Sequence, residues 1–337
     1  IAGEVMAGIG VACTGLATTL YTLLPARLLV GVGSAMAAAG SNVYLADLTA
    51  APNIRTHRAA IMGLQGVAMA VAWVAGPALG GFICDRYGPR MGFLVVGVAV
   101  AMCGLAYTWL PETLQRKHDT GSQPLSEGYS RHVSVLSLLR DRTQQGVLCS
   151  HFALALDYAA MTVLIPLHAA AVWSATPGQI GLMFSALSVL CVLGAPVAGH
   201  LADNYGRKAV LVPSLLLLAV GSAALGPAAN THSFLVALFI LGAGDAVISP
   251  PLNALTADAA PSNQKGEALA LSRQVADIAY TFGPLALGMM YDYCGPVVAM
   301  GSLAVVNSAS AVFLHYFVVE PPREEMQADA QQEKAGN

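Results

Sequence analysis

Ten stretches of this chain are each long and apolar enough to cross a lipid bilayer. They occupy about residues 1–23, 25–47, 58–83, 90–110, 146–171, 177–200, 208–228, 232–255, 266–290 and 296–318. A helix needs roughly 20 mostly apolar residues to cross the hydrocarbon. Each backbone N–H and C=O must be satisfied there without water, so the segments are helices, because a β-barrel shows short alternating segments instead. The pattern predicts an all-α polytopic membrane protein with ten spans.

The low charge of the chain supports this interpretation. Only 10 % of the 337 residues are charged, whereas a typical soluble domain has about 25 %. A soluble protein with so little charge could not cover its surface with polar groups. The net charge of −3 and the scattered basic residues give no indication of a nucleic-acid partner. The lipid bilayer is therefore the expected environment.

No motif points to a metal, a cofactor or catalysis. The six cysteines form no CxxC pair and lie mostly in apolar stretches, where free thiols behave as small apolar groups. A dinucleotide-type GVGSAM run begins at Gly31, but it lies inside a predicted span and no soluble strand precedes it. We therefore expect no metal site, no cofactor and no enzymatic activity.

The distribution of Lys and Arg predicts the orientation in the membrane. The loops on one side of the predicted membrane contain only Arg86 and Arg90, whereas the loops and tails on the other side carry twelve basic residues. These are Arg55, Arg58, Arg116, Lys117, Arg131, Arg140, Arg142, Arg207, Lys208, Lys265, Arg323 and Lys334. Because cytosolic loops are enriched in basic residues, the central segment 111–145, the polar tail 319–337 and both ends of the chain are predicted to be cytosolic. The tail is expected to be disordered.

An internal repeat relates the two halves of the chain. Two sets of residues match at a constant offset of 207. The first set is Gly76, Pro77, Gly81, Asp85, Gly88 and Pro89, and the second is Gly283, Pro284, Gly288, Asp292, Gly295 and Pro296. One span earlier, Gly31, Gly33 and Asp47 match Gly242, Gly244 and Asp258. The repeat predicts two parallel halves, 1–110 and 146–318, which is a recurring plan of secondary transporters.

The repeat also predicts that the chain is incomplete. The half 146–318 contains six of the predicted spans, whereas the half 1–110 contains four. We therefore expect two further spans before Ile1 and twelve in a complete protein.

A loop motif and several glycine patterns carry a family resemblance. Residues 199–208 read GHLADNYGRK, which is similar to the cytosolic signature G-x-L-A-D-R-x-G-R-[RK] of the major facilitator superfamily, with Asn204 in place of the Arg that follows the Asp. Arg27, Gly31 and Gly33 are similar to the opening of the family's fourth span. The glycines around Gly76-Pro77 resemble a fifth-span signature described in antiporters, and LPETL at 110–114 resembles the end of the sixth span. The resemblance covers essentially residues 1–320.

This resemblance implies a function and a mode of action. It implies a secondary transporter, expected to be a monomer, whose two halves rock around a central site, and it favours the proton-coupled antiporters of drugs and metabolites. The substrate is then a small organic molecule, exported in exchange for protons. The alternatives are a metabolite uniporter or symporter, or a non-transporting ten-span receptor or scaffold.

Charged residues within predicted spans are the candidates for substrate and proton coupling, because a charge at membrane depth is costly unless paired or hydrated. These residues are Arg27, Asp157, Asp245, Arg273 and Asp277. A carboxyl group at membrane depth binds a proton more readily than one in water, which suits Asp157 to proton exchange. The alternative for Asp157 is a hydrated position near a span end. Arg273 and Asp277 lie one helical turn apart, so a mutually neutralising pair is the alternative to a direct role.

Two further sets of residues have predicted roles in movement. In the loop signature, Gly199, Asp203, Gly206, Arg207 and Lys208 form a predicted cytosolic gate, with Asp203 latching onto Arg58 at the start of the 58–83 helix. The Gly-Pro positions, Gly76, Pro77, Gly81, Gly283, Pro284 and Gly288, are predicted to allow bending or close helix packing.

Overall fold

A computed structural model describes residues 1–50, 58–110, 135–260 and 264–318, and in these ranges the chain is helical without strands. The first part holds α1 (Ala2–Leu16), α2 (Leu20–Ala50), α3 (Arg58–Tyr87), α4 (Pro89–Ala106) and the 3₁₀ turn η2 (Tyr107–Trp109). After α5 (Val135–Arg140) come α6 (Arg142–Trp173), α7 (Pro177–Tyr205), α8 (Arg207–Leu225), α9 (Thr231–Asp258), α10 (Lys265–Cys294) and α11 (Pro296–Phe317). The all-α fold class is confirmed for the described residues.

Eight of the described helices are long and apolar enough to cross a membrane. Helix α1 is apolar but has only 15 residues. Helix α10 is long enough, but it is the least apolar of the long helices because Lys265, Glu267, Arg273, Asp277 and Asp292 all lie within it. The ten predicted spans all fall on helices, and these two fall short of a simple length-and-hydropathy criterion.

The helix bounds differ from the expected ones at several places, and two of the differences have a local cause. The predicted break between residues 23 and 25 lies earlier, because α1 ends at Leu16 and α2 begins at Leu20. Thr19 and Thr22 exchange backbone-to-hydroxyl hydrogen bonds of 3.2 and 3.3 Å, which satisfies free N–H groups at the start of α2 in the manner of a capping box. Helix α6 begins at Arg142 rather than 146, since the Asp141 side chain accepts a hydrogen bond from the Thr143 N–H.

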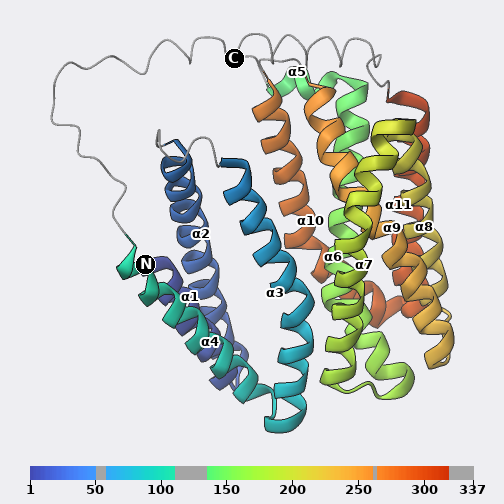
Figure 1. Cartoon of the computed structure of the whole chain (residues 1–337). Helices are drawn as coiled ribbons and strands as arrows, with labels where there is room; N and C mark the ends of the chain where they lie inside the picture. Colours follow the sequence, from blue (N-terminus) through green and yellow to red (C-terminus); the bar gives the residue numbers. More distant parts are fainter. Residues whose placement is uncertain (51–57, 111–134, 261–263, 319–337) are drawn as a thin grey trace, which may run out of the picture. The chain divides into compact units, whose positions relative to one another are not determined.

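The chain divides into two compact units (Figure 1). The first unit contains α1 to α4 together with Thr176–Ser185, and the second contains α5, α6, the rest of α7, and α8 to α11. The predicted central segment and tail lie outside the described residues, apart from α5 and the start of α6.

Glycines set the spacing of helices in the first unit, where α1 packs against both α2 and α4. Gly3 of α1 and Gly33 of α2 face each other so closely that neither leaves room for a Cβ atom. The same is true of Gly8 of α1 and Gly97 of α4. In lipid, small residues at helix crossings allow close van der Waals packing where no hydrophobic driving force exists.

The second unit has the larger packed core. Helices α8 and α9 pack most closely, with Gly221 against the backbone of Leu241 and Gly244 against the backbone carbonyl of Ser214. Phe234, at the start of α9, is fully buried. Asn230 caps the start of α9 through a reciprocal pair of bonds with Ser233. This core holds α6, α8, α9 and α11 in fixed positions, and these helices carry the polar residues described below.

Three pairs of helices meet at a glycine with positive φ. Gly88 joins α3 to α4 at φ +82°, Gly206 joins α7 to α8 at φ +98°, and Gly295 joins α10 to α11 at φ +84°. Each follows an aspartate by three residues, in a shared D-x-x-G pattern. With ψ values between 153° and 169°, the three turns adopt a backbone conformation that is essentially restricted to glycine. The sequence repeat therefore corresponds to a repeated helix-to-helix turn.

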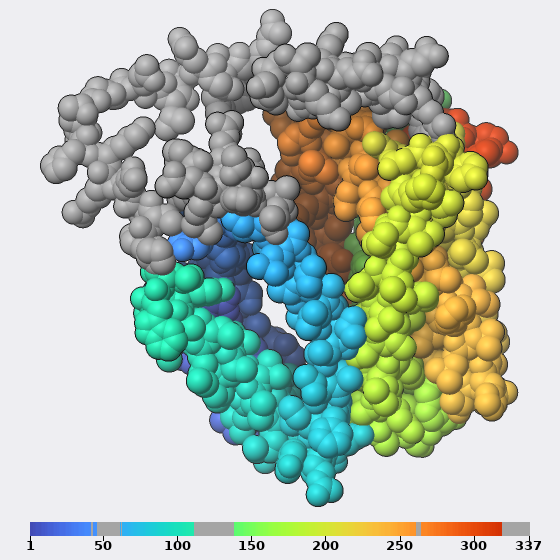
Figure 2. Space-filling view, viewed as in Figure 1, coloured from blue at the N-terminus to red at the C-terminus, as the bar shows by residue number. Residues whose placement is uncertain are grey.

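The outer sides of the helices are apolar. In the space-filling view the sides of α3 and α7 lie open to the surroundings (Figure 2). Trp73 and Phe82 on α3 and Leu193 on α7 are each more than 60 % exposed. Exposed apolar surface of this extent suits hydrocarbon rather than water.

We predict that Gly206→Ala lowers the free energy of unfolding by about 1–3 kcal/mol, because a Cβ strains this backbone conformation. Thermal unfolding in detergent, followed by intrinsic fluorescence, measures the effect. The matched control is Gly301→Ala in α11, where a Cβ meets no atom within 4 Å. An unfolding temperature equal to that of the unmodified chain would show that the turn tolerates a side chain.

Candidate functional site

Among the described residues of the second unit, the most buried carboxylate is Asp157, about halfway along α6. It is 2 % exposed, and both of its oxygens accept hydrogen bonds from the Asn307 amide of α11, at 3.1 and 2.9 Å. Asn307 is itself 1 % exposed. A second polar contact joins the same two helices, between the hydroxyls of Ser150 and Ser310 at 3.0 Å. The position is fully enclosed, so the alternative of a hydrated carboxylate at a span end does not hold.

A second buried carboxylate, Asp245, projects from α9 and is 6 % exposed. The thiol of Cys191, on α7, donates to Asp245 Oδ2 at 3.3 Å. Asp245 also lies close enough to interact electrostatically with Asp157 and with the neighbouring Tyr158. The ring of Tyr158 lies 6.4 Å from that of Tyr280 on α10. The fold therefore gathers two carboxyl groups, a thiol and two phenols into one polar cluster.

The two carboxyl groups of this cluster have no positively charged partner among the described residues. Neither Asp157 nor Asp245 has a Lys, Arg or His nitrogen within 4.0 Å in the described ranges. Two mutually close carboxylates in a medium of low dielectric cannot both remain ionised without large cost. Chemically, the cluster can exchange protons and can attract a cation.

Arg273 and Asp277 do not form the ion pair that their spacing suggested. Both side chains are exposed on α10, and no ion pair joins them within 4.0 Å. Both interact electrostatically with Tyr280, and Asp245 also interacts electrostatically with Tyr280. Arg273 and Asp277 thus lie beside the polar cluster, and their role in coupling stays a prediction.

Arg27 belongs to the first unit, whereas the residues of the buried cluster belong to the second. Its guanidinium carbon lies 5.9 Å above the ring centre of Phe93 on α4, a cation–π arrangement. This contact gives the charge a partner within the unit.

The loop signature is organised by two charged contacts within the second unit. Arg207, at the start of α8, forms an ion pair with Asp258, the last residue of α9. Lys208 donates to the backbone carbonyl of Val318 at 2.8 Å, which places a positive charge at the C-terminus of α11. Both contacts join helix ends, so Arg207 and Lys208 support the packing of this unit.

The predicted latch partner cannot be placed. Asp203 is exposed near the end of α7, and Gly199 lies one turn before it with open space around its Cα. The side chain of Arg58 lies outside the described residues.

The Gly-Pro positions have unequal packing roles. Gly283 packs against Leu156 and Ala159 of α6, and Gly81 packs against Pro177 in the segment that belongs to the first unit. Gly76 and Gly288 face open space. Pro77 and Pro284 lie inside α3 and α10, but five further helices (α2, α6, α7, α8 and α9) also contain an interior proline. Interior prolines therefore do not single out α3 and α10.

A buried histidine links three helices near the opposite end of α6. His168 Nε2 lies 3.1 Å from the Leu225 carbonyl and Nδ1 lies 3.0 Å from the Tyr291 hydroxyl. Because a carbonyl only accepts, Nε2 carries the hydrogen, and a neutral ring satisfies both contacts. The ring also packs 5.7 Å from that of Phe234. His168 is thus held in one orientation by structural contacts.

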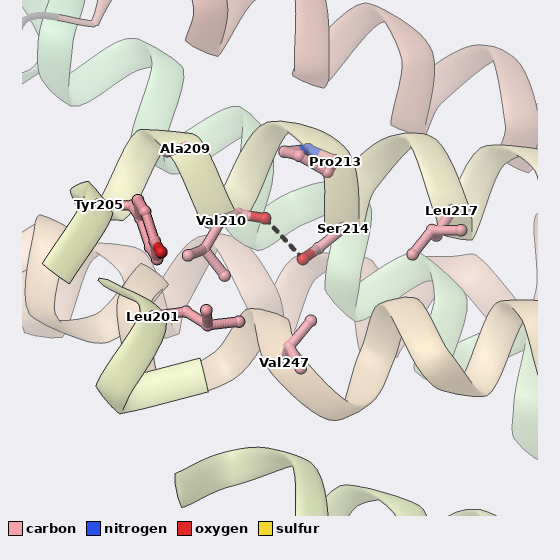
Figure 3. Close-up of a pocket in the computed structure, with 8 residues that line it drawn as sticks. All are labelled: Leu201, Tyr205, Ala209, Val210, Pro213, Ser214, Leu217 and Val247. Atoms are coloured by element: carbon pink, nitrogen blue, oxygen red, sulfur yellow. Dashed lines mark hydrogen bonds between the residues drawn. The ribbon is translucent and has the colours of Figure 1, made fainter. Parts of the chain in front are cut away.

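An apolar groove opens on the second unit between the end of α7, the first part of α8 and α9 (Figure 3). Its volume is about 430 Å³, and its lining includes Leu201, Pro213, Leu217 and Val247. The Ser214 hydroxyl, which is part of the lining, donates to the Val210 carbonyl at 2.7 Å. None of the residues that line the groove carries a charged side chain.

The structure adds four residues to the predicted set. Asn307, Tyr158 and Cys191 contact the buried carboxylates, and Asp258 pairs with Arg207. A signal for Asn307 was present, because an uncharged amide in the middle of an apolar helix needs a partner. Asp258 was visible only as a match to Asp47 in the repeat. Among the described residues, no three His, Cys, Asp or Glu side chains are grouped as a metal site.

Both the family model and the similar known proteins belong to one family of membrane transporters. The sequence model of the Major Facilitator Superfamily matches residues 1–143 and 147–336. An uncharacterized MFS-type transporter of Methanocaldococcus jannaschii is 21 % identical over 323 residues, which are 95 % of this chain and 81 % of that protein. A homologue of the multi-drug resistance efflux pump PmrA from Lactococcus lactis is 22 % identical over 304 residues, covering 86 % of this chain and 71 % of the relative.

A solved structure shows the same fold. The bacterial homologue of the human lysosomal transporter Spinster, crystallised in an inward-facing and unoccupied conformation, aligns with a TM-score of 0.65. The alignment has 14 % identity and covers 93 % of this chain and 79 % of that structure.

Proposed function

Because this chain belongs to the Major Facilitator Superfamily, whose members move small molecules across membranes, we propose that it exports a small organic molecule in exchange for protons. The observation that carries the proposal is the pair of buried carboxyl groups, Asp157 and Asp245, with no cationic partner among the described residues. Groups that are costly to keep ionised at membrane depth are suited to binding and releasing protons. The relative named as a multidrug efflux pump supports export.

The coupling follows from competition for negative charge. When Asp157 and Asp245 hold protons, the cluster is neutral and has little attraction for a substrate cation. When they release protons, the charge favours a cation or another polar substrate group. We propose that the charges of Arg273 and Asp277, which act on Tyr280 of the cluster, modulate this exchange. We propose the same role for the charge of Arg27 in the first unit.

We predict that the purified chain, reconstituted in liposomes, moves ethidium only when a pH gradient is imposed. Ethidium is used as a probe cation, and its fluorescence reports the flux. Asp157→Asn should reduce gradient-driven flux to the level of protein-free liposomes, because the amide cannot bind and release a proton. The matched control Asp292→Asn changes an exposed aspartate near the end of α10 and should leave the flux unchanged.

Two results would contradict the proposal. Flux of ethidium without any dependence on the gradient would favour a uniporter. Undiminished gradient-driven flux in Asp157→Asn would remove this carboxyl group from the coupling.

The cytosolic gate is a second part of the proposal. We expect Asp203→Asn to lower the maximal rate of ethidium flux while its affinity for the dye stays the same, because the latch affects closure rather than binding. Initial rates over a range of dye concentrations separate the two quantities. Asn204→Ala is the control, since this neighbouring side chain bonds locally to the His200 carbonyl at 2.9 Å. Equal rates in Asp203→Asn and the unmodified chain would refute the latch.

A further inference from the structure

Asn307, the hydrogen-bond partner of Asp157, uses only one end of its amide group. Asn307 directs its Nδ2 group at both carboxylate oxygens, at 3.1 and 2.9 Å, while its Oδ1 atom is buried without a hydrogen-bond partner. The Ser222 hydroxyl of α8 also lies beside Asp157, and a hydroxyl can donate a hydrogen bond to the carboxylate. One buried acceptor oxygen, Asn307 Oδ1, therefore lies unused next to a carboxylate that already receives donated hydrogen bonds.

An unused acceptor next to a carboxyl group matters when that group gains a proton. An ionised carboxylate only accepts hydrogen bonds, whereas a protonated carboxyl group also donates one. Leaving a buried donor or acceptor unpaired costs free energy. The Nδ2 group of Asn307 satisfies the ionised form, and rotation of the same amide by half a turn presents Oδ1 to the protonated form.

We infer that Asn307 is a positioning residue that serves both proton states of Asp157, by turning its amide when the carboxyl group gains or loses a proton. The inference rests on the proposed role of Asp157 as a proton site and identifies how that site is held. The proton binds to one carboxylate oxygen, and the resulting O–H donates to Asn307 Oδ1. The contact between α6 and α11 then persists in both states.

The titratable groups around Asp157 form no hydrogen bond with it among the described residues. From α9, Asp245 acts on Asp157 through its charge, and no hydrogen bond joins the two carboxyl groups among the described residues. On α10, Tyr280 contacts the neighbouring Tyr158, and Arg273 and Asp277 act on Tyr280 rather than on Asp157. From α7, Cys191 directs its thiol to Asp245. Asn307 therefore provides the two amide hydrogen bonds of this carboxylate.

The test is infrared spectroscopy of the purified chain in lipid, titrated with acid. The carbonyl band of protonated Asp157 is identified by its absence in Asp157→Asn. In Asn307→Leu, which is similar in shape but cannot form hydrogen bonds, the midpoint of protonation should rise by about one to two pH units, because the ionised form loses a charge-assisted hydrogen bond. The band should also shift to higher frequency, since the protonated form loses its acceptor.

Two further variants complete the experiment. Ser310→Ala removes the other polar contact of the same helix pair and should change neither midpoint nor frequency. Asn307→Ser keeps a hydroxyl that can accept, so its band should lie closer to that of the unmodified chain. This variant provides the test if Asn307→Leu fails to fold.

The outcomes separate this inference from the proposed function. If the Asp157 band titrates but Asn307→Leu and Asn307→Ser leave its frequency unchanged, the amide does not serve the protonated form and the inference is overturned. If no Asp157 band titrates at all, the proton site itself is wrong, and the inference falls with it.

Discussion

Inside a bilayer no water is available to a peptide group, and this constraint shapes the structure at every level. It requires helices along the described membrane segments, and it makes the first and last turns of each helix depend on local partners. Thr19 with Thr22, Asn230 with Ser233, and Asp141 supply such partners at helix starts. Close glycine contacts then hold the helices together where hydrophobic association has no driving force.

The same constraint applies to side chains and gives the candidate site its chemistry. A carboxyl group in this environment must be hydrogen-bonded, paired with a cation or protonated. Arg207 and Asp258 use pairing and thereby join helix ends. Asp157 is hydrogen-bonded by Asn307, Asp245 receives the Cys191 thiol, and neither has a cation within 4.0 Å in the described ranges. Protonation is the remaining means of removing their charge, which connects the packing of the second unit with the proposed exchange of protons.

Much of the fold and part of the site could be predicted from the sequence. Helix positions follow from apolar length, and the repeat matched Asp85 and Gly88 with Asp292 and Gly295, which the structure places in a shared type of turn. The partners of Asp157 could not be predicted, because the apolar residues of α6 are spread around the helix rather than gathered on one face, and its sequence does not define the rotation about its axis. For the same reason the one-turn spacing of Arg273 and Asp277 suggested an ion pair that the structure lacks. Interactions between distant helices depend on packing, which short-range spacing does not determine.

The most direct test of proton exchange is to count protons released when substrate binds. Purified chain in weakly buffered detergent solution is mixed with ethidium, and a pH indicator reports the change. Exchange predicts that the dye displaces protons, and that the release disappears when Asp157→Asn and Asp245→Asn are combined. Binding of the dye with no proton release, or with proton uptake, would contradict exchange at these carboxyl groups.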